Sequence, residues 1–230
     1  MFFVVKKRNL ILAVALTLIL ALTGTGIALT QAGLFSQKKK TVVIDAGHGG
    51  ADRGVVGKNG LVEADLNLCI SLLLEEKLKS SDLGVTMTRR TKDGLYGELT
   101  DNFKARDFAA RKKTIVDADP DMVVSIHANK FPGNASRRGI QVFYNAASGE
   151  GKNFAVAMQE KMNVLNEKYV GKTYSPLAGD YFMLNCTQNP SIIVECGFLS
   201  NEEDEKLLSD GEYRQELTDM IVLGIVDYCF

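Results

Sequence analysis

The chain has 230 residues, of which 46% are hydrophobic and 24% charged, an ordinary balance for a globular protein. The first 40 residues carry six Lys or Arg and no Asp or Glu, which leaves 21 basic against 28 acidic residues, a net charge of −7, on the rest. An acidic domain of this kind has no clustered Lys and Arg to neutralise phosphates, so nucleic acid is excluded as a partner.

The first 40 residues predict a membrane segment and a tether. Residues 1–9 hold the basic run Lys6-Lys7-Arg8 and are expected in the cytoplasm. Residues 10–29 form an apolar stretch of about 20 residues, long enough to cross a bilayer as a helix. The small-residue motif Thr30-Gln31-Ala32 is a weak cleavage site, so we expect a retained anchor, with secretion after signal cleavage as the alternative. Residues 30–40 then tether an extracytoplasmic domain.

From residue 41 onward, strand patterns alternate with helical patterns. Strands are expected at 41–44, 84–88, 122–127, 139–144, 181–184 and 191–195, and helices at 61–79, 101–118 and 150–168. The capping boxes Ser200-x-x-Glu203 and Ser209-x-x-Glu212 each predict a further helix, the second running through Phe230. This order predicts one α/β domain over residues 41–230, with a mostly parallel, mixed sheet of about six strands flanked by helices.

The helix before residue 118 is expected to have Thr100 or Asp101 as its N-cap. Its inward face is expected to comprise Ala105, Phe108, Ala109, Ile115 and Val116. The later stretch from Asn145 to Ala178 has room for one amphipathic helix and little else.

The four cysteines, Cys69, Cys186, Cys196 and Cys229, form neither a CxxC pair nor a zinc-finger spacing. Cys69 lies among apolar residues and is expected in the core. A nucleophilic Cys196 would need a histidine as its general base, and both histidines have a better use, so we expect it to be a packing residue. A Cys186–Cys196 disulfide stays open.

The glycine-rich loop at residues 47–60 first has to be tested as a phosphate-binding loop. A Walker loop ending at Gly57-Lys58 would need glycine at position 52 and Ser or Thr at position 59, but these are Asp52 and Asn59. A dinucleotide-binding fingerprint starting at Gly47 also needs glycine at position 52. Both patterns therefore fail.

Both histidines of the chain follow buried-strand patterns. His48 follows Thr41–Ala46 and Gly47, and His127 ends the run that starts at Met122. In open α/β sheets, the carboxyl ends of the strands are where ligands bind. Two imidazoles delivered to that edge predict a metal site, and a catalytic zinc would take a carboxylate as its third protein ligand.

The residues alone leave the third ligand and the role of Glu195 open. Glu63, at the opening of the helix after the loop, competes with Asp45 and Asp52 for the metal. A glutamate in a first helical turn is also favoured by the helix dipole. Glu195 ends the apolar strand Ser191–Val194, where it either pairs with an arginine or acts as an acid/base next to the metal.

A set of motifs settles these alternatives by resemblance. The chain contains Val42-Val-Ile-Asp-Ala-Gly-His48-Gly-Gly, Gly60-Leu-Val-Glu63, Thr88-Arg89, Ser125-Ile-His127-Ala-Asn129 and Val194-Glu195-Cys-Gly-Phe-Leu-Ser-Asn201. In this order, and over residues 41–230, the chain resembles the zinc-dependent N-acetylmuramoyl-L-alanine amidases of the amidase-3 family. The membrane span and the Gly139–Tyr144 strand look similar to the germination-specific, membrane-anchored amidases that act on spore cortex.

The resemblance implies that His48, Glu63 and His127 bind Zn²⁺ and that Glu195 is the catalytic glutamate. It also implies a peptidoglycan substrate, cleaved at the amide between the lactyl group of N-acetylmuramic acid and L-alanine of the stem peptide. It names no activating protein partner. Cys196 is a departure from the aliphatic residue that is usual there. Some relatives insert an autoinhibitory helix, for which this chain has no room, so we expect an open cleft.

Two other classes of function remain as alternatives. The first is another zinc peptidase, which would cut the stem peptide instead of the bond to the sugar. The second is a wall-binding protein without catalytic activity, which a degenerate site would favour. Arg89, Arg137 and Arg138 are basic residues that could contact carboxylates of the wall, but we leave them out of the expected site because exposed arginines usually point to solvent.

Overall fold

The computed structural model describes residues 15, 18–19 and 39–229. The expected cytoplasmic segment, nearly all of the expected membrane span, and residues 30–38 of the tether lie outside these residues. None of the helices within the described residues is long and apolar enough to cross a membrane. Residues from Lys39 onward form one compact unit, which begins close to the expected boundary at residue 41.

One six-stranded sheet organises this unit. Its strands are β1 (Thr41–Ala46), β2 (Gly84–Met87), β3 (Met122–Asn129), β4 (Gln141–Tyr144), β5 (Leu177–Ala178) and β6 (Ser191–Phe198). They lie in the order β2-β1-β3-β6-β4-β5. The first four in that order are parallel to one another, and β4 pairs antiparallel with β6. The expected mixed, mostly parallel sheet is confirmed.

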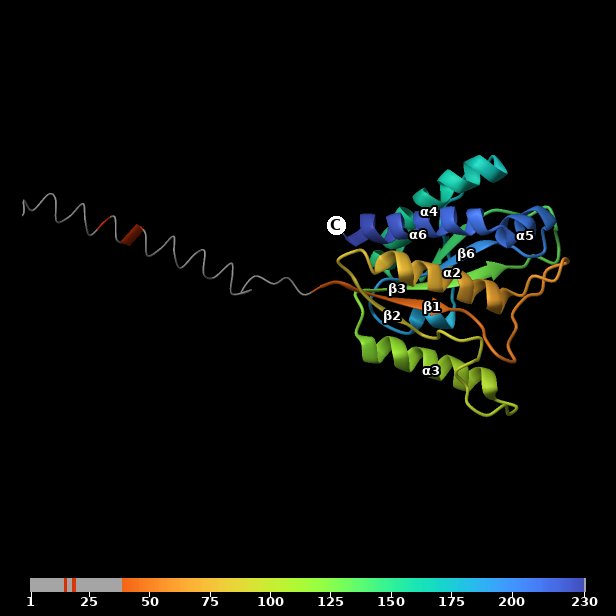
Figure 1. Cartoon of the computed structure of the whole chain (residues 1–230), viewed down its shortest axis with the longest axis horizontal. Coiled ribbons are helices and arrows are strands. Elements are labelled where there is room, and N and C mark those ends of the chain that lie inside the picture. The colour runs from red at the N-terminus through yellow and green to blue at the C-terminus, as the bar shows by residue number, and fades with distance from the viewer. Residues whose placement is uncertain (1–14, 16–17, 20–38, 230) are drawn as a thin grey trace, which may run out of the picture. The chain divides into compact units, whose positions relative to one another are not determined.

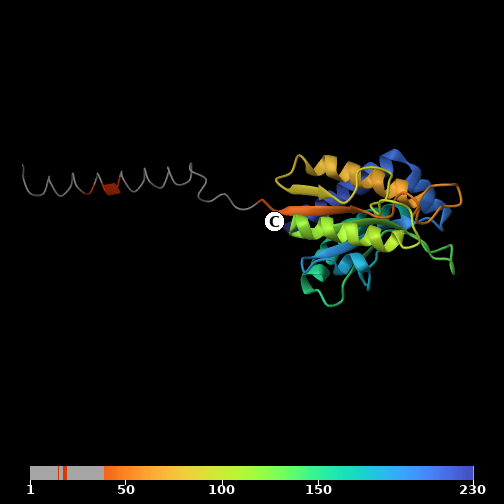
Figure 2. The same cartoon turned by 90° about the horizontal axis from the view of Figure 1, so that it is seen from below.

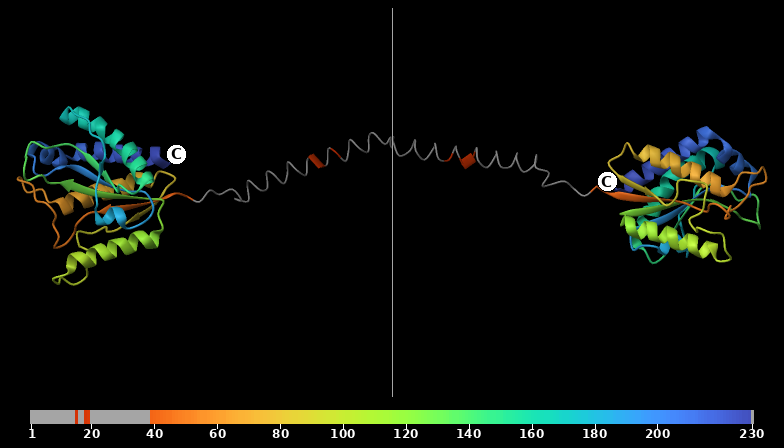
Figure 3. Two further views of the ribbon diagram at one scale, coloured as in Figure 1. Left: turned by 180° about the vertical axis from the view of Figure 1, so that it is seen from behind. Right: turned by 60° about the horizontal axis from the view of Figure 1, so that its bottom comes forward.

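Helices cover both faces of the sheet (Figures 1 and 2). They are α2 (Glu63–Leu78), α3 (Phe103–Ala118), α4 (Gly149–Val170), α5 (Glu202–Ser209) and α6 (Gly211–Cys229), with a 3₁₀ helix η1 (Phe182–Asn185). α2, α4 and α6 pack together on one face, and α3 and η1 cover the other. Figure 3 shows the same layers from two further directions.

The core explains why the central strands read as continuous apolar runs. Val42 and Ile44 point into the cluster under α2, α4 and α6, whereas Val43 points into the smaller cluster under α3. All three are fully buried. A strand buried on both faces shows no alternation of polar and apolar residues, which is typical of parallel strands covered by helices.

Several local predictions are wrong. The expected strand at 181–184 is the 3₁₀ helix η1, and the outermost strand is β5, a few residues earlier. Asn201 and Asp210 accept the hydrogen bonds that open α5 and α6, one residue after each expected cap. The residue before α3 is Asn102, which makes no side-chain capping bond.

The inward face of α3 also differs from the prediction. Phe108 and Val116 are 41% and 54% exposed, whereas Ile115 is buried as expected. The other buried residues on this helix are Asp107 and Arg111. The stretch from Asn145 to Ala178 contains a single helix, α4, as expected.

Candidate metal centre

Strand pairing brings the expected functional residues to one edge of the sheet. β3 and β6 pair in parallel, with His127 directly opposite Glu195. His48 follows β1, which pairs with β3 on its other side through Ala46 and Ile126. The loops after these strands lie together at the right of Figure 1. The carboxyl edge of the sheet therefore holds both imidazoles and one carboxylate.

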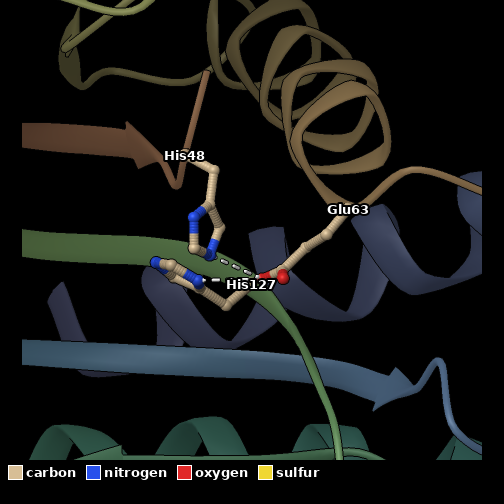
Figure 4. A group of neighbouring side chains, drawn as sticks. All are labelled: His48, Glu63 and His127. Atoms are coloured by element: carbon tan, nitrogen blue, oxygen red, sulfur yellow. Dashed lines mark hydrogen bonds and ion pairs between the residues drawn. The ribbon is translucent and has the colours of Figure 1, made fainter. Parts of the chain in front are cut away.

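Glu63 is the first residue of α2 and reaches this edge from the helical layer (Figure 4). Its Oε1 lies 3.2 Å from His48 Nε2 and 3.1 Å from His127 Nδ1. One ligand atom from each of the three residues lies within 4.8 Å of the other two. The Glu63 carboxylate is oriented by the backbone N–H groups of Val55 and Ala128, which donate to it.

Glycines let the backbone approach these side chains closely. A Cβ at Gly47 would lie 2.3 Å from the His127 ring, and a Cβ at Gly54 would lie 2.4 Å from Glu63 Oε2. His48 itself has a φ of 60°, in the left-handed region that non-glycine residues rarely adopt. Such a conformation tends to occur where a side chain has a functional task.

A further carboxylate orients His48 from behind. His48 Nδ1 lies 2.9 Å from Asp52 Oδ2, and Lys104 forms an ion pair with the other oxygen of Asp52. Burial acts to lower the pKa of His48, but its contacts with Glu63 and Asp52 outweigh burial and raise it. Burial acts to raise the pKa of Glu63, but hydrogen bonds from His127 and His48 hold it well below its ordinary value. The His48 imidazole and the Glu63 carboxylate therefore each stabilise the charged form of the other.

Glu195 shares a cavity with both histidines but makes no hydrogen bond through its inner oxygen. The cavity, of ≈ 270 Å³, is lined by His48, Phe108, His127, Tyr181, Phe182, Met183, Ile193 and Glu195. Glu195 Oε2 is buried and has no hydrogen-bond partner among the described residues. Burial raises the pKa of Glu195 to about 7, although the nearby charge of His127 acts to lower it. No arginine pairs with it in the described structure.

The other two candidate ligands have different roles. Asp45 is fully buried and bonds to Arg111, Thr88 and Ser125. Asp52 contacts His48 on the side away from Glu63. Neither belongs to the group of residues that could hold a metal ion. Of the three carboxylates weighed from the sequence, only Glu63 meets both imidazoles.

Two buried arginines hold the backbone of the site, and the sequence analysis missed this. Arg111 donates to the carbonyl oxygens of Ala46 and His48 while pairing with Asp45. Arg89, 3% exposed, donates to the carbonyl oxygens of Ala46 and Gly47. A lone aspartate inside an otherwise apolar strand, as at position 45, was the available signal for a buried partner.

The remaining arginines and the cysteines lie outside the chemistry. Arg137 stacks over Phe131, and Arg138 pairs with Asp204. All four cysteines are free, so the Cys186–Cys196 disulfide does not form here. Cys196 is 1% exposed and burial raises its thiol pKa, which fits a packing residue. Cys69 is only partly buried.

The fold and the site together define a class of protein. A His–Glu–His group beside a separate buried carboxylate, at the carboxyl edge of an α/β sheet, is typical of hydrolases that use a metal ion. Residues 42–227 match the family described as N-acetylmuramoyl-L-alanine amidase. The chain belongs to this family.

Individual relatives agree with the family assignment. The germination-specific N-acetylmuramoyl-L-alanine amidase of Bacillus subtilis is 32% identical over 192 residues, which cover 82% of this chain and 79% of that protein. The uncharacterized protein YqiI of the same organism is 32% identical, covering 91% of this chain and 95% of that protein. The CwlD amidase from Clostridioides difficile, solved in complex with the GerS lipoprotein, has a TM-score of 0.75 at 34% identity and covers 83% of this chain and 98% of that one.

The function follows from family membership. The chain is an N-acetylmuramoyl-L-alanine amidase, a peptidoglycan hydrolase that cuts the amide between N-acetylmuramic acid and L-alanine of the stem peptide. The resemblance stated from the sequence motifs is confirmed at this level. Cell wall hydrolysis places its action outside the cytoplasm.

Proposed function

We propose that the amidase reaction of this chain depends on zinc held by His48, Glu63 and His127, with Glu195 as the catalytic acid/base. The observation that carries the proposal is the convergence on one point of these three side chains, which come from the loop after β1, from α2 and from β3. Glu195 opens onto the same cavity from β6.

The donor set fits a zinc ion. Ligand atoms around a tetrahedral zinc with bonds of about 2.0–2.1 Å lie roughly 3.3 Å apart. The contacts of Glu63 Oε1 with the two imidazole nitrogens, 3.2 and 3.1 Å, are close to this separation. Two imidazoles and one carboxylate also form a common ligand set of catalytic zinc, in which a fourth position stays open. The hydrogen bond between His48 and Asp52 supplies the orienting carboxylate that zinc-binding histidines usually have.

In this proposal, three residues hold the metal ion and Glu195 transfers the proton. A zinc ion held by His48, Glu63 and His127 would supply the Lewis acidity needed to polarise the lactyl carbonyl and to acidify a water molecule. Glu195, which lines the cavity beside the two histidines, accepts the proton of the attacking water on its carboxylate. It returns that proton to the alanine nitrogen as the amide bond breaks, because an amine leaves readily only when protonated. A pKa raised by burial to about 7 suits a group that must both accept and donate a proton near neutrality.

The first prediction concerns the ligands. We expect the full-length chain to retain one equivalent of zinc after dialysis, and His48→Ala and His127→Ala to retain close to none, because two ligands bind zinc far more weakly than three. Elemental analysis of the dialysed proteins measures this. Asp52→Asn is the graded control, since loss of an orienting partner weakens metal binding by about 10- to 100-fold. Full zinc occupancy in a His48→Ala/His127→Ala double variant would refute the assignment.

The reaction products distinguish the amidase from the alternative, a zinc peptidase that cuts within the stem peptide. Purified peptidoglycan is digested, and the released fragments are analysed by mass spectrometry and amine labelling. The amidase releases complete stem peptides with a free L-alanine amine and leaves the glycan intact. A peptidase would release shortened peptides and leave alanine attached to the sugar.

We also propose that residues 10–29 anchor the chain in the membrane and that residues 30–40 tether the domain at residues 41–230 outside the cytoplasm. The apolar stretch and the basic residues before it support this proposal. We expect the full-length chain to sediment with membranes after cell lysis and to resist extraction by high salt. A chain that begins at Lys39 is expected in the supernatant. Expression of the full-length gene that yields a supernatant protein cut at residues 30–32 would instead establish signal cleavage.

The proposed biological setting is the spore cortex. Identity to the germination-specific amidase of B. subtilis and likeness to CwlD support it. If the proposal holds, deletion of the gene is expected to leave the spore cortex of the organism that carries it without the muramic lactam that such amidases prepare. The CwlD structure contains the GerS lipoprotein, so the reaction of the purified chain, measured with no other protein present, decides whether catalysis here needs a partner.

A further inference from the structure

The cavity at Glu195 has an aromatic side that the proposed chemistry leaves unused. Phe108 of α3, Tyr181 directly before η1, and Phe182 in η1 line it together with the two histidines. These side chains are 41%, 44% and 46% exposed. Large apolar groups gathered at an exposed site mark a binding surface more often than chance. We call these three residues the aromatic wall.

Contacts among distant segments hold the aromatic wall in place. The rings of Phe108 and Phe182 have centroids 5.1 Å apart, although they lie on different elements. Tyr181 packs edge-on against Phe143 of β4, at 5.4 Å. The next residues along η1, Met183 and Leu184, are buried and fix this segment to the sheet. The wall is therefore a built surface rather than a set of scattered exposed side chains.

The chemistry of the substrate differs on the two sides of the bond that is cut. On one side, a short lactyl ether joins the scissile carbonyl to a pyranose ring, which has C–H groups on its faces and hydroxyl and acetamido groups at its edge. On the other side lies a peptide with small methyl groups and charged ends. Flat aromatic faces bury the first kind of surface well, because the C–H groups leave water while the polar edge stays solvated.

Accepting the zinc-dependent mechanism proposed above, we propose that the aromatic wall binds the pyranose ring of the N-acetylmuramoyl group and so makes the enzyme specific for lactyl amides that carry a sugar. Phe108 and Phe182 act as specificity-determining residues, since they meet the substrate away from the reacting atoms. The shared cavity places the ring next to the metal ligands and Glu195.

The test compares two substrates that differ only in the sugar. One is N-acetylmuramoyl-L-alanyl-D-isoglutamine, and the other is the D-lactoyl form of the same dipeptide. We expect Phe182→Ala and Phe108→Ala each to lower kcat/KM on the first substrate by roughly tenfold, mainly through KM, which is the range for loss of one aromatic contact. On the lactoyl dipeptide, the same variants are expected to change kcat/KM less than about twofold, because a contact absent from the substrate cannot be lost.

Phe131→Ala is the matched control. Phe131 is 39% exposed, close to the value for Phe108, but it packs under Arg137 and does not line the cavity. Its substitution is expected to leave both substrates unaffected. Phe182→Tyr, which keeps the ring face, is expected to retain most of the activity on the muramoyl substrate. Zinc content measured for each variant shows whether the metal ligands are undisturbed.

Two results would overturn the proposal: an equal loss on both substrates, which would assign the wall to the peptide or to the shape of the site, and no loss on either. A second measurement separates this proposal from the amidase reaction itself. The full-length Glu195→Gln chain is titrated with N-acetylmuramoyl-L-alanyl-D-isoglutamine by calorimetry, with and without Phe182→Ala. About tenfold weaker binding in the double variant supports the wall even if the wild-type chain turns over neither substrate, and equal binding contradicts it.

Discussion

Glu195→Gln is expected to lower kcat for the release of stem peptides from peptidoglycan by about 10²- to 10⁴-fold, which is the contribution typical of a positioned acid/base. The amide has nearly the volume of the carboxylate, so packing in the cavity is conserved. It can neither accept the proton of the attacking water nor return it to the alanine nitrogen. The variant is therefore expected to bind zinc and substrate as the wild type does, while the chemical step fails.

The measurement follows both quantities on the same preparation. Reverse-phase chromatography of the released peptides gives the rate, and elemental analysis gives zinc per chain. Glu167→Gln, an exposed position on α4, is the matched control and is expected to leave both unchanged. Turnover by Glu195→Gln within tenfold of the wild type would remove Glu195 from the chemistry. A loss of turnover together with zinc would assign it to metal binding.

The sheet was predictable because its strands carry strong local signals. β1, β3 and β6 each contain a short apolar run rich in β-branched residues, and each run leads to a polar side chain: His48 two residues after β1, His127 within β3 and Glu195 within β6. Parallel pairing then places the ends of such strands together, which is how two distant histidines could be assigned to one edge. Sequence separation is no obstacle when strand order follows from a simple α/β pattern.

The failed predictions lie where tertiary contacts override local patterns. The apolar run at 181–184 is too short for its period to separate a strand from a helical turn. On α3, hydrophobic periodicity selects Phe108 and Val116 as inward, but the helix turns Asp107, Arg111 and Ile115 to the sheet. Arg111 occupies an inward position, although it is charged, because it forms an ion pair with Asp45, which is buried on β1. That partnership is invisible in either segment taken alone.

The candidate site shows the same limit. The two histidines could be named from residue type and strand position, whereas the choice of Glu63 over Asp45 and Asp52 came only from the family resemblance. The contacts of Asp52, Arg89 and Arg111 could not be predicted, because their partners are backbone carbonyls or ring nitrogens brought together by folding. The left-handed conformation of His48 likewise depends on the glycines around it and on the arginine that holds its carbonyl oxygen.

Arg111→Met is expected to destabilise the domain by about 3–5 kcal/mol, the usual effect of removing one partner from a buried ion pair. Arg111 is 2% exposed and lies between Asp45, at 2.7 Å, and Asp107, at 2.6 Å. Methionine fills much of the volume but leaves Asp45 charged and without its cation inside the core. For a domain of this size, the melting temperature is expected to fall by roughly 6–20 °C.

Lys113→Met is the matched control, since Lys113 lies on the same helix and pairs with Asp117 one turn later, but in solvent. An exposed pair of this kind contributes about 0–1 kcal/mol. Thermal unfolding of both variants is followed by circular dichroism with a chelator present, so that metal binding does not add to stability. A loss in Arg111→Met no larger than in Lys113→Met would show that the buried pair contributes little.

The pH dependence of the unfolding free energy tests why Arg111→Met destabilises the domain. Burial alone would raise the pKa of Asp45, but Arg111, together with the charge of His127 and hydrogen bonds from Ser125 and Thr88, outweighs burial and holds this pKa below its ordinary value. A carboxyl with a lowered pKa stabilises the folded state above the unfolded pKa of about 4, and this contribution disappears as pH falls through the folded pKa. In Arg111→Met, the largest of the effects that oppose burial is lost, so Asp45 takes up a proton already at higher pH and its buried charge disappears. The stability difference between wild type and variant should therefore be largest at neutral pH and shrink in acid, whereas a purely steric defect would give a difference independent of pH.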